Sequence, residues 1–83
     1  MKATVYIAPQ CPHAAKLIEF LAANGVEMEK KSILDGDNVV RELFEVSKQR
    51  AVPVAVIDGE VFVGFDRRVE RRLKRKLEGT GSV

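Results

Sequence analysis

Cys11 carries the most nucleophilic side chain of this sequence, and it is the only cysteine among 83 residues. Pro12 follows it directly, and proline, which has a fixed φ and no N–H, suits the first position of a helix. A thiol just before a helix faces the positive end of the helix dipole and backbone N–H groups without partners. Both favour the thiolate, the nucleophilic form of cysteine. A free cysteine also occurs as a small buried hydrophobe, so the local pattern leaves a reactive thiolate and a core residue both open.

The length and composition of the chain predict one small globular domain. We expect this domain to span residues 1–78 and to be followed by a flexible tail, residues 79–83. Hydrophobic residues make up 46% of the chain, close to the proportion in globular proteins. No apolar run approaches the roughly 20 residues that cross a bilayer, so we expect no membrane association. One cysteine cannot form an internal disulfide, and we therefore expect a reducing compartment, the cytoplasm.

The apolar periodicity predicts the elements that must position Cys11. Helical stripes follow Pro12, the turn Asp35–Asn38 and Asp66, where Asp35–Asn38 and Asp66 supply N-caps. The pair Asn24-Gly25 ends the first helix, and Asp58-Gly59 predicts a two-residue hairpin. The expected strands are Thr4–Ile7, Val26–Ile33, Val52–Ile57 and Glu60–Val63, the second of them at a sheet edge.

The resulting order is β-α-β-α-β-β-α. The first half is a βαβ unit, so its two strands should be parallel, and the second half is a hairpin followed by a helix. We therefore predict an α/β fold with a four-stranded mixed sheet flanked by helices. The apolar stripe expected on the second helix consists of Val39, Val40, Leu43, Phe44 and Ser47.

Four segments in this order resemble the glutaredoxins, which have the thioredoxin fold. Tyr6–His13 is similar to the strand, proline and Cys-Pro-aromatic-Cys motif with which the family begins, and Phe20-Leu21 matches a pair in its first helix. Gln49–Val54 resembles the family's Thr-Val-Pro segment, and Asp58–Asp66 resembles its hairpin and following turn. The match covers roughly residues 3–77. It implies a thioredoxin-like fold and a redox-active cysteine. It also implies that the protein is a thiol–disulfide oxidoreductase that acts in electron transport and cell redox homeostasis.

The sequence departs from the family pattern at two positions. Ala14 stands where the second active-site cysteine would fall, and the chain also lacks the Cys-Gly-Phe-Ser pattern of iron–sulfur monothiol glutaredoxins. Ala14 is compatible with a natural monothiol protein and with an engineered replacement of cysteine by alanine. Ala8 stands where many glutathione-binding members carry a lysine.

The resemblance implies a catalytic site formed by Cys11, Pro12, His13 and Ala14. It also implies a substrate- or glutathione-binding site formed by Gln49, Arg50, Val52, Pro53 and Asp66.

Each of these residues also has a purely structural interpretation. His13 either adds positive charge near Cys11 or is solvated in the first helical turn. Gln49 and Arg50 either hold a substrate carboxylate or form a polar helix end. By resemblance Pro53 is cis, faces the cysteine and leaves the backbone of its neighbour Val52 free to pair with substrate, whereas by type alone it simply starts a strand.

Asp66 can serve as a helix cap and, by resemblance, bind the amino end of glutathione.

We predict that the Cys11 thiolate forms a mixed disulfide with glutathione or a protein substrate, with glutathione as a co-substrate and no metal site. One alternative is a binding module in which two chains share an iron–sulfur cluster. Another is a dithiol electron donor that works with a reductase, if Ala14 is engineered. We expect a monomer.

The basic residues are concentrated at the C-terminal end. Residues 66–83 carry seven Lys/Arg against three Asp/Glu, whereas residues 1–65 carry seven against nine. Arg68, Arg71, Arg72 and Arg75 recur at the spacing of one helix face. A solvated face and a docking surface for an acidic protein both fit this pattern. The helix has no aromatic residue for stacking bases, so we expect no specific nucleic-acid binding.

Overall fold

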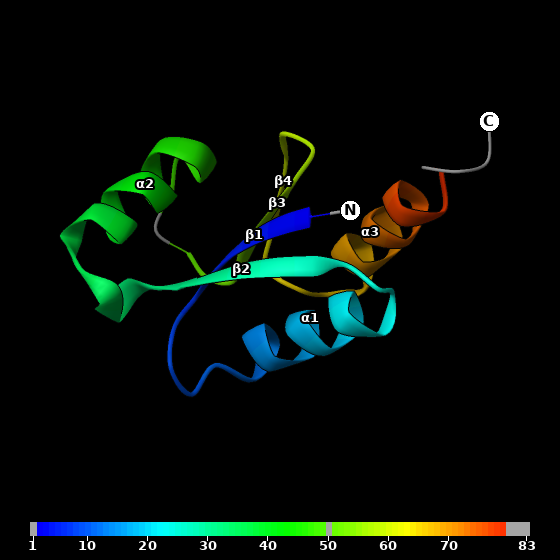
Figure 1. Ribbon diagram of the computed structural model, residues 1–83, viewed down its shortest axis with the longest axis horizontal. Coiled ribbons are helices and arrows are strands. Elements are labelled where there is room, and N and C mark those ends of the chain that lie inside the picture. The colour runs from blue at the N-terminus through cyan, green and yellow to red at the C-terminus, as the bar shows by residue number, and fades with distance from the viewer. Residues whose placement is uncertain (1, 50, 80–83) are drawn as a thin grey trace.

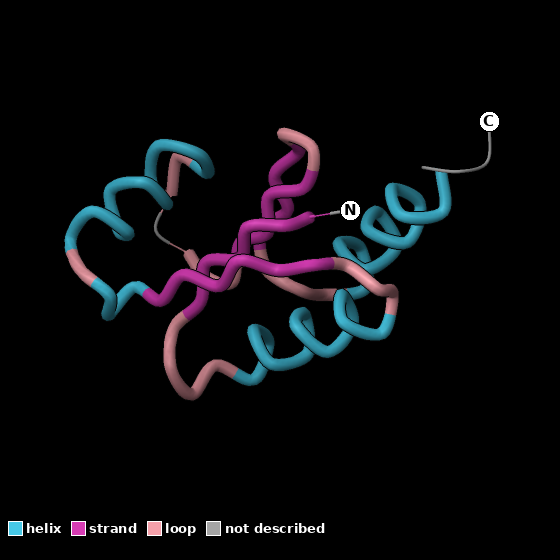
Figure 2. Tube along the Cα trace, in the orientation of Figure 1, coloured by secondary structure: helices cyan, strands magenta, loops and turns pink. Residues whose placement is uncertain are grey.

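The computed structural model describes residues 2–49 and 51–79, and it has the predicted order of strands and helices with one added 3-10 helix, η1 (Figures 1 and 2). The strands are β1 (Lys2–Ile7), β2 (Glu27–Ser32), β3 (Val54–Ile57) and β4 (Glu60–Val63). The helices are α1 (Pro12–Ala23), η1 (Ile33–Asp35), α2 (Asp37–Ser47) and α3 (Arg67–Gly79). None of the described helices is both long and apolar enough to cross a bilayer.

The four strands form one mixed sheet in the order β2-β1-β3-β4. β1 and β2 are parallel, as the βαβ pattern predicts, and β3 is antiparallel to both β1 and β4. β2 therefore lies at a sheet edge, as the sequence predicted.

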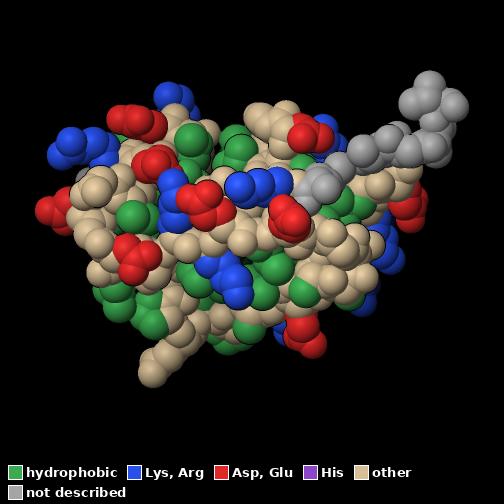
Figure 3. Space-filling model, in the orientation of Figure 1, with side chains coloured by type: hydrophobic (Ala, Val, Ile, Leu, Met, Phe, Trp, Pro, Cys, Tyr) green, Lys and Arg blue, Asp and Glu red, His purple; other side chains and the backbone are tan. Residues whose placement is uncertain are grey.

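On the face shown in Figure 3, Lys/Arg and Asp/Glu side chains are interspersed with smaller hydrophobic areas.

The sheet lies between helices on both faces. α1 and α3 cover one face and α2 lies on the other (Figure 1). Both cores receive side chains from the same strands, because successive side chains of a strand point to opposite faces of the sheet. The larger core includes Val5, Ala55, Ile57, Leu17, Leu21, Phe62 and Leu73. The smaller core, under α2, is built on Tyr6, Leu43 and Val54.

The predicted turns are present. The chain after α1 reverses through Asn24 and Gly25, and the φ of Gly25 is 73°. Asp58 and Gly59 have φ values of 52° and 80°, the pair of positive angles that a type I′ hairpin turn requires. Asp58 tolerates this conformation better than most residues, and glycine adopts it without steric cost.

The structure corrects several local predictions. β2 ends at Ser32, because Ile33 enters η1, and β3 begins at Val54 rather than at Val52. The turn Asp35–Asn38 does not supply a side-chain cap for α2, whose N-cap is Gly36. Asp35 instead accepts a hydrogen bond from the backbone N–H of Ser32, at 2.9 Å, as part of a capping box for η1.

The apolar stripe of α2 is narrower than the sequence pattern suggested. Leu43 is buried against the sheet, whereas Phe44 is 50% exposed. The two residues are adjacent, about 100° apart around the helix, and the sheet covers the side of Leu43 but only part of the side of Phe44. At the C-terminus, α3 continues through Gly79, and the rest of the predicted tail, residues 80–83, lies outside the described residues.

Candidate functional site

Cys11 is the N-cap residue of α1. Its backbone is extended (φ −102°, ψ 110°), and its carbonyl accepts a hydrogen bond from the N–H of Ala15 at 3.2 Å. Pro12 begins the helix and has no N–H, so the first free donors of α1 belong to His13 and Ala14. No side chain within residues 2–49 and 51–79 caps these donors. A thiolate at Cys11 would therefore meet the positive end of α1, as the sequence predicts.

The sheet register brings the other candidate segments to the same edge. Tyr6 pairs with Val54, and Val54 pairs with Val63, so these three residues form one row across β1, β3 and β4. The chain leaves β1 toward Cys11, enters β3 from Pro53, and leaves β4 toward the start of α3. All three segments therefore lie at one end of the sheet.

The proline of this edge follows a cis peptide bond, as the family resemblance implied. The Val52–Pro53 peptide bond is cis, and Pro53 is buried. The Pro53 carbonyl accepts a hydrogen bond from the N–H of Gly64 at 2.7 Å, which ties the start of β3 to the end of β4. β3 begins one residue after Pro53, so the strand ladder does not use the backbone of Val52.

Asp66 caps α3, as predicted. Its Oδ1 accepts a hydrogen bond from the backbone N–H of Val69 at 2.9 Å, and its own carbonyl accepts one from the N–H of Glu70. The cap fixes the carboxylate at the beginning of α3, and the residue is exposed. One carboxylate oxygen thus acts in the cap while the group stays accessible to solvent.

Beside Cys11 lies an open hollow of about 460 Å³. Its lining is mostly apolar and consists of Ile7, Ala8, Gln10, Cys11, Pro12, Ala14, Ala15 and Ile18. Ala14 is buried and Cys11 is partly exposed, so the thiol lies at the rim between the core and solvent. Gln49, Val52, Pro53 and Asp66 do not line this hollow.

Two of the predicted polar residues lie on the surface. His13 is exposed in the first turn of α1. Gln49 is exposed after the end of α2, where its carbonyl lies 2.8 Å from the hydroxyl of Ser47, which donates to it or to the carbonyl of Leu43. Arg50, the remaining predicted binding residue, lies outside the described residues.

Gln10 is a site residue that the sequence reasoning missed. Its φ is 58°, a left-handed conformation that costs a non-glycine residue about 1 kcal/mol or more. Such strain often marks functional segments, and here it sets the direction of the chain one residue before the thiol. Its position between two prolines, Pro9 and Pro12, was the available signal, since closely spaced prolines restrict how the chain can turn.

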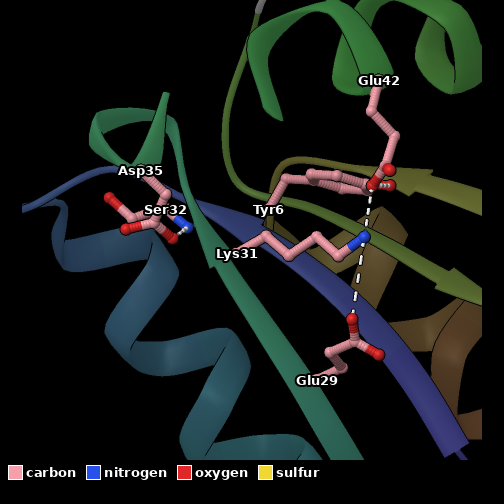
Figure 4. Close-up of polar contacts among 6 residues, drawn as sticks. All are labelled: Tyr6, Glu29, Lys31, Ser32, Asp35 and Glu42. Carbon is pink, nitrogen blue, oxygen red and sulfur yellow. Dashed lines mark hydrogen bonds and ion pairs between the residues drawn. The ribbon is translucent and has the colours of Figure 1, made fainter. Parts of the chain in front are cut away.

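A polar cluster holds α2 against the sheet on the face away from Cys11's helix (Figure 4). Glu42 of α2 accepts hydrogen bonds from the hydroxyl of Tyr6 and from Lys31 Nζ, the latter at 2.6 Å. Lys31 also lies 3.6 Å from Glu29. The cluster ties α2 to β1 and β2, and α2 leads directly into the segment that contains Pro53.

The contacts of the cluster shift the ionisation of its members. The hydrogen bonds from Lys31 and then from Tyr6 hold the pKa of the Glu42 carboxyl below its ordinary value. The hydrogen bond to Glu42 raises the pKa of Lys31. Burial, followed by the neighbouring Glu42, raises the pKa of Tyr6. All three groups therefore keep their neutral-pH forms, with Tyr6 protonated and Glu42 and Lys31 charged.

Within residues 2–49 and 51–79, no three His, Cys, Asp or Glu side chains are grouped closely enough to hold a metal ion. The described part of the site thus consists of one thiol, a helix N-terminus, a cis proline and a capping carboxylate.

A mixed four-stranded sheet between α1 and α3 on one face and α2 on the other, with an N-cap cysteine and a cis proline at one edge, defines a thioredoxin-like protein. The family model named Glutaredoxin matches residues 3–62. This match covers well over half of the chain, and the chain belongs to the glutaredoxin family, a family of thiol–disulfide oxidoreductases.

Individual relatives agree with this assignment. A glutaredoxin-like 8.6 kDa protein in the rubredoxin operon of Clostridium pasteurianum is 33% identical over 63 residues, covering 76% of this chain and 84% of that protein. The glutaredoxin of Archaeoglobus fulgidus has a crystal structure with a TM-score of 0.76 and 26% identity, covering 92% of this chain and 84% of that one. A buckwheat glutaredoxin–glutathione complex shares the fold, with a TM-score of 0.66, 15% identity and coverages of 93% and 69%.

Proposed function

We propose that this protein is a monothiol thiol–disulfide oxidoreductase that works through Cys11 and uses glutathione as its reducing co-substrate. The observation that carries the proposal is the position of Cys11 as the N-cap of α1, next to the uncapped N–H groups of His13 and Ala14. The cis proline and the cap of Asp66 lie at the same sheet edge and support a binding site around it. The reducing cytoplasm is the compartment we propose for it.

The reaction is a pair of thiol–disulfide exchanges. The Cys11 thiolate attacks the glutathione sulfur of a glutathionylated substrate, a new S–S bond forms as the old one breaks, and the substrate leaves as a thiolate that takes a proton from water. A thiolate of free glutathione then attacks the mixed disulfide at the glutathione sulfur and releases Cys11. The substrate thiol is thereby reduced, and two glutathione molecules leave as glutathione disulfide.

Several residues have distinct proposed roles in binding. The free backbone of Val52, next to cis Pro53, would pair with the peptide backbone of glutathione or of a protein substrate. The Asp66 carboxylate would accept a hydrogen bond from the amino end of glutathione. Gln49 and Arg50 would bind a carboxylate of the substrate. The glutathione complex of the buckwheat protein supports the choice of ligand.

The test is turnover of a glutathionylated peptide in the presence of excess glutathione. We expect turnover with the native protein and none with Cys11→Ser. When free glutathione is left out, the native protein should accumulate an adduct of one glutathione on Cys11, which mass spectrometry detects. His13→Ala serves as a second variant, which should keep the adduct, since His13 is exposed and outside the hollow. Absence of both turnover and adduct in the native protein would exclude the proposed activity.

A further inference from the structure

α3 carries a larger net charge than any other described helix or strand. α3 carries seven Lys/Arg and two Glu, whereas the other residues of the chain carry seven Lys/Arg and ten Asp/Glu. Val69 and Leu73 turn the inner face of the helix toward the sheet, and both are buried. The charges must therefore lie on the outer face and along the flanks.

The cations on the two sides of α3 differ in whether they form ion pairs within the described residues. On the flank toward β4, Glu60 binds Arg72 at 3.2 Å and Lys76 at 3.5 Å, and the Arg72 guanidinium lies 4.8 Å from the centre of the Phe62 ring. These cations are satisfied within the protein. The α3 basic face consists of the exposed cations that have no ion pair with any described residue: Arg67, Arg68, Arg71, Lys74 and Arg75.

The α3 basic face begins near the sheet edge at which β1 leads to Cys11. α3 begins directly after Asp66, at the sheet edge where β1 leads to Cys11 and β3 begins at Pro53. From there its 13 residues run about 20 Å. A protein bound along this face can therefore present a disulfide to Cys11 while it stays in contact with α3.

We propose that the α3 basic face is a docking surface for an acidic protein, which is the disulfide substrate or redox partner that exchanges with Cys11. The inference rests on the proposed function and names the class of its protein partner. Five cations on one helix face complement a short acidic segment, and such complementarity raises association rates more than it raises final affinity. A nucleic acid fits less well, because its backbone would extend beyond one 20 Å helix onto a remainder of the chain that is net acidic, and because α3 offers no aromatic side chain for stacking.

The experiment compares three synthetic peptides that share one cysteine, present as a mixed disulfide with neutral 2-mercaptoethanol. A flexible linker of about eight residues joins this cysteine to a tract of about six Glu, Lys or Gln residues, and the linker can span about 25 Å when extended. We expect Cys11 to react with the Glu peptide about tenfold faster than with the Gln peptide at low ionic strength. The Lys peptide should be the slowest, and all differences should shrink at about 1 M salt, where the Debye length is about 3 Å.

Two triple variants distinguish a local surface from the net charge of the molecule. Arg68→Glu, Arg71→Glu and Arg75→Glu together should remove the preference for the Glu peptide and leave the rate with the Gln peptide within about twofold. The matched control, Lys2→Glu, Lys16→Glu and Lys30→Glu, changes net charge equally at exposed positions elsewhere and should retain the preference. An equal loss in both variants, or no preference in the native protein, would overturn the proposal.

A binding measurement separates this proposal from the proposed function. A cysteine-free Glu-tract peptide should shift the amide resonances of α3 in an NMR titration even if Cys11 proves unreactive toward every disulfide. Reaction with all peptides at one rate and no α3 shifts would leave the oxidoreductase standing and refute the docking surface. Shifts caused by a short DNA duplex at about 0.15 M salt, with none from the peptide, would also refute it and point to nucleic acid.

Discussion

At the scale of single residues, Cys11 and Asp66 both precede the first residue of a helix, but only the Asp66 side chain caps its helix. Cys11 occupies an N-cap position, yet its side chain does not cap α1, so the helix donors remain available to a thiolate. Asp66 occupies the corresponding position before α3 and does cap its helix. The start of α1 is thus left without a side-chain cap, whereas the start of α3 has one.

The structural role of Asp66 and its proposed role in binding glutathione can be separated by experiment. We expect Asp66→Ala to lower the free energy of unfolding by about 1 kcal/mol, because the N–H of Val69 loses its acceptor. Asp66→Asn keeps a capping oxygen and should remain within about 0.5 kcal/mol of the native protein, while raising the KM for glutathione. Chemical denaturation and steady-state kinetics measure the two effects. An unchanged KM in the Asn variant would confine Asp66 to the cap.

Ala14 gives a direct test of the geometry around Cys11. We predict that Ala14→Cys creates a dithiol, because residue 14 lies three positions after Cys11, on the same side of the first turn, and both border the same hollow. Oxidation should then remove two hydrogen masses reversibly, and the variant should reduce protein disulfides. Lys16→Cys, exposed on α1 and outside the hollow, is the matched control and should form only intermolecular disulfides. Two free thiols in oxidised Ala14→Cys would contradict the expected spacing.

At the scale of elements, α2 is positioned by a polar contact as well as by its apolar side. Leu43 is its only buried residue, while Phe44 is half exposed. The Glu42 contacts to Tyr6 and Lys31 therefore help fix the helix that leads to the cis-proline segment. We expect the packing of this segment to depend on the charge of Glu42.

Glu42→Gln should make stability less dependent on acid pH. Since hydrogen bonds lower the pKa of Glu42 in the folded state, its carboxylate stabilises the fold above the ordinary glutamate pKa, and this contribution is lost as pH falls below that value. The free energy of unfolding of the native protein should exceed that of the variant at pH 7 by less than about 1 kcal/mol, because the Glu42 side chain is 41% exposed and solvent screens its contacts. The difference should vanish near pH 3.

Denaturation midpoints at several pH values measure this difference. Glu45→Gln, on the exposed side of α2, is the control and should show little difference at any pH. A difference for Glu42→Gln that persists unchanged to pH 3 would mean that lost packing, rather than charge, causes it.

At the scale of the whole molecule, the larger core is buried between the sheet, α1 and α3 of one chain. Its largest fully buried side chains, such as Phe62, Leu17 and Leu73, lie between the elements of this chain. The alternative of a shared iron–sulfur cluster would need two copies, with a Cys11 from each. Oligomeric state therefore distinguishes that alternative from the oxidoreductase.

We predict that the protein stays a colourless monomer after anaerobic incubation with iron and sulfide. Analytical ultracentrifugation and visible absorption measure the two properties together, with and without glutathione. Cys11→Ser controls for iron bound elsewhere. A coloured dimer that forms only with Cys11 present would replace the oxidoreductase proposal with cluster binding.

The sequence by itself determined the order of elements, the hairpin and both helix starts at Pro12 and Asp66. These features depend on local rules: proline at a first helical position, two turn residues with positive φ, and a short carboxylate before an apolar stripe. It could not determine that Gly36 caps α2, that η1 follows β2, or that Gln10 is left-handed, because neighbouring segments decide which of several local options the chain adopts.

Only the tertiary structure brought the site together. Cys11, Pro53 and Asp66 are far apart in sequence, and they reach one edge through the row of Tyr6, Val54 and Val63. The tertiary structure also divided the cations of α3, because Glu60 comes from a hairpin whose position next to the helix depends on packing. Local sequence patterns encode helices, strands and turns, whereas pairing register and long-range burial decide which side chains meet.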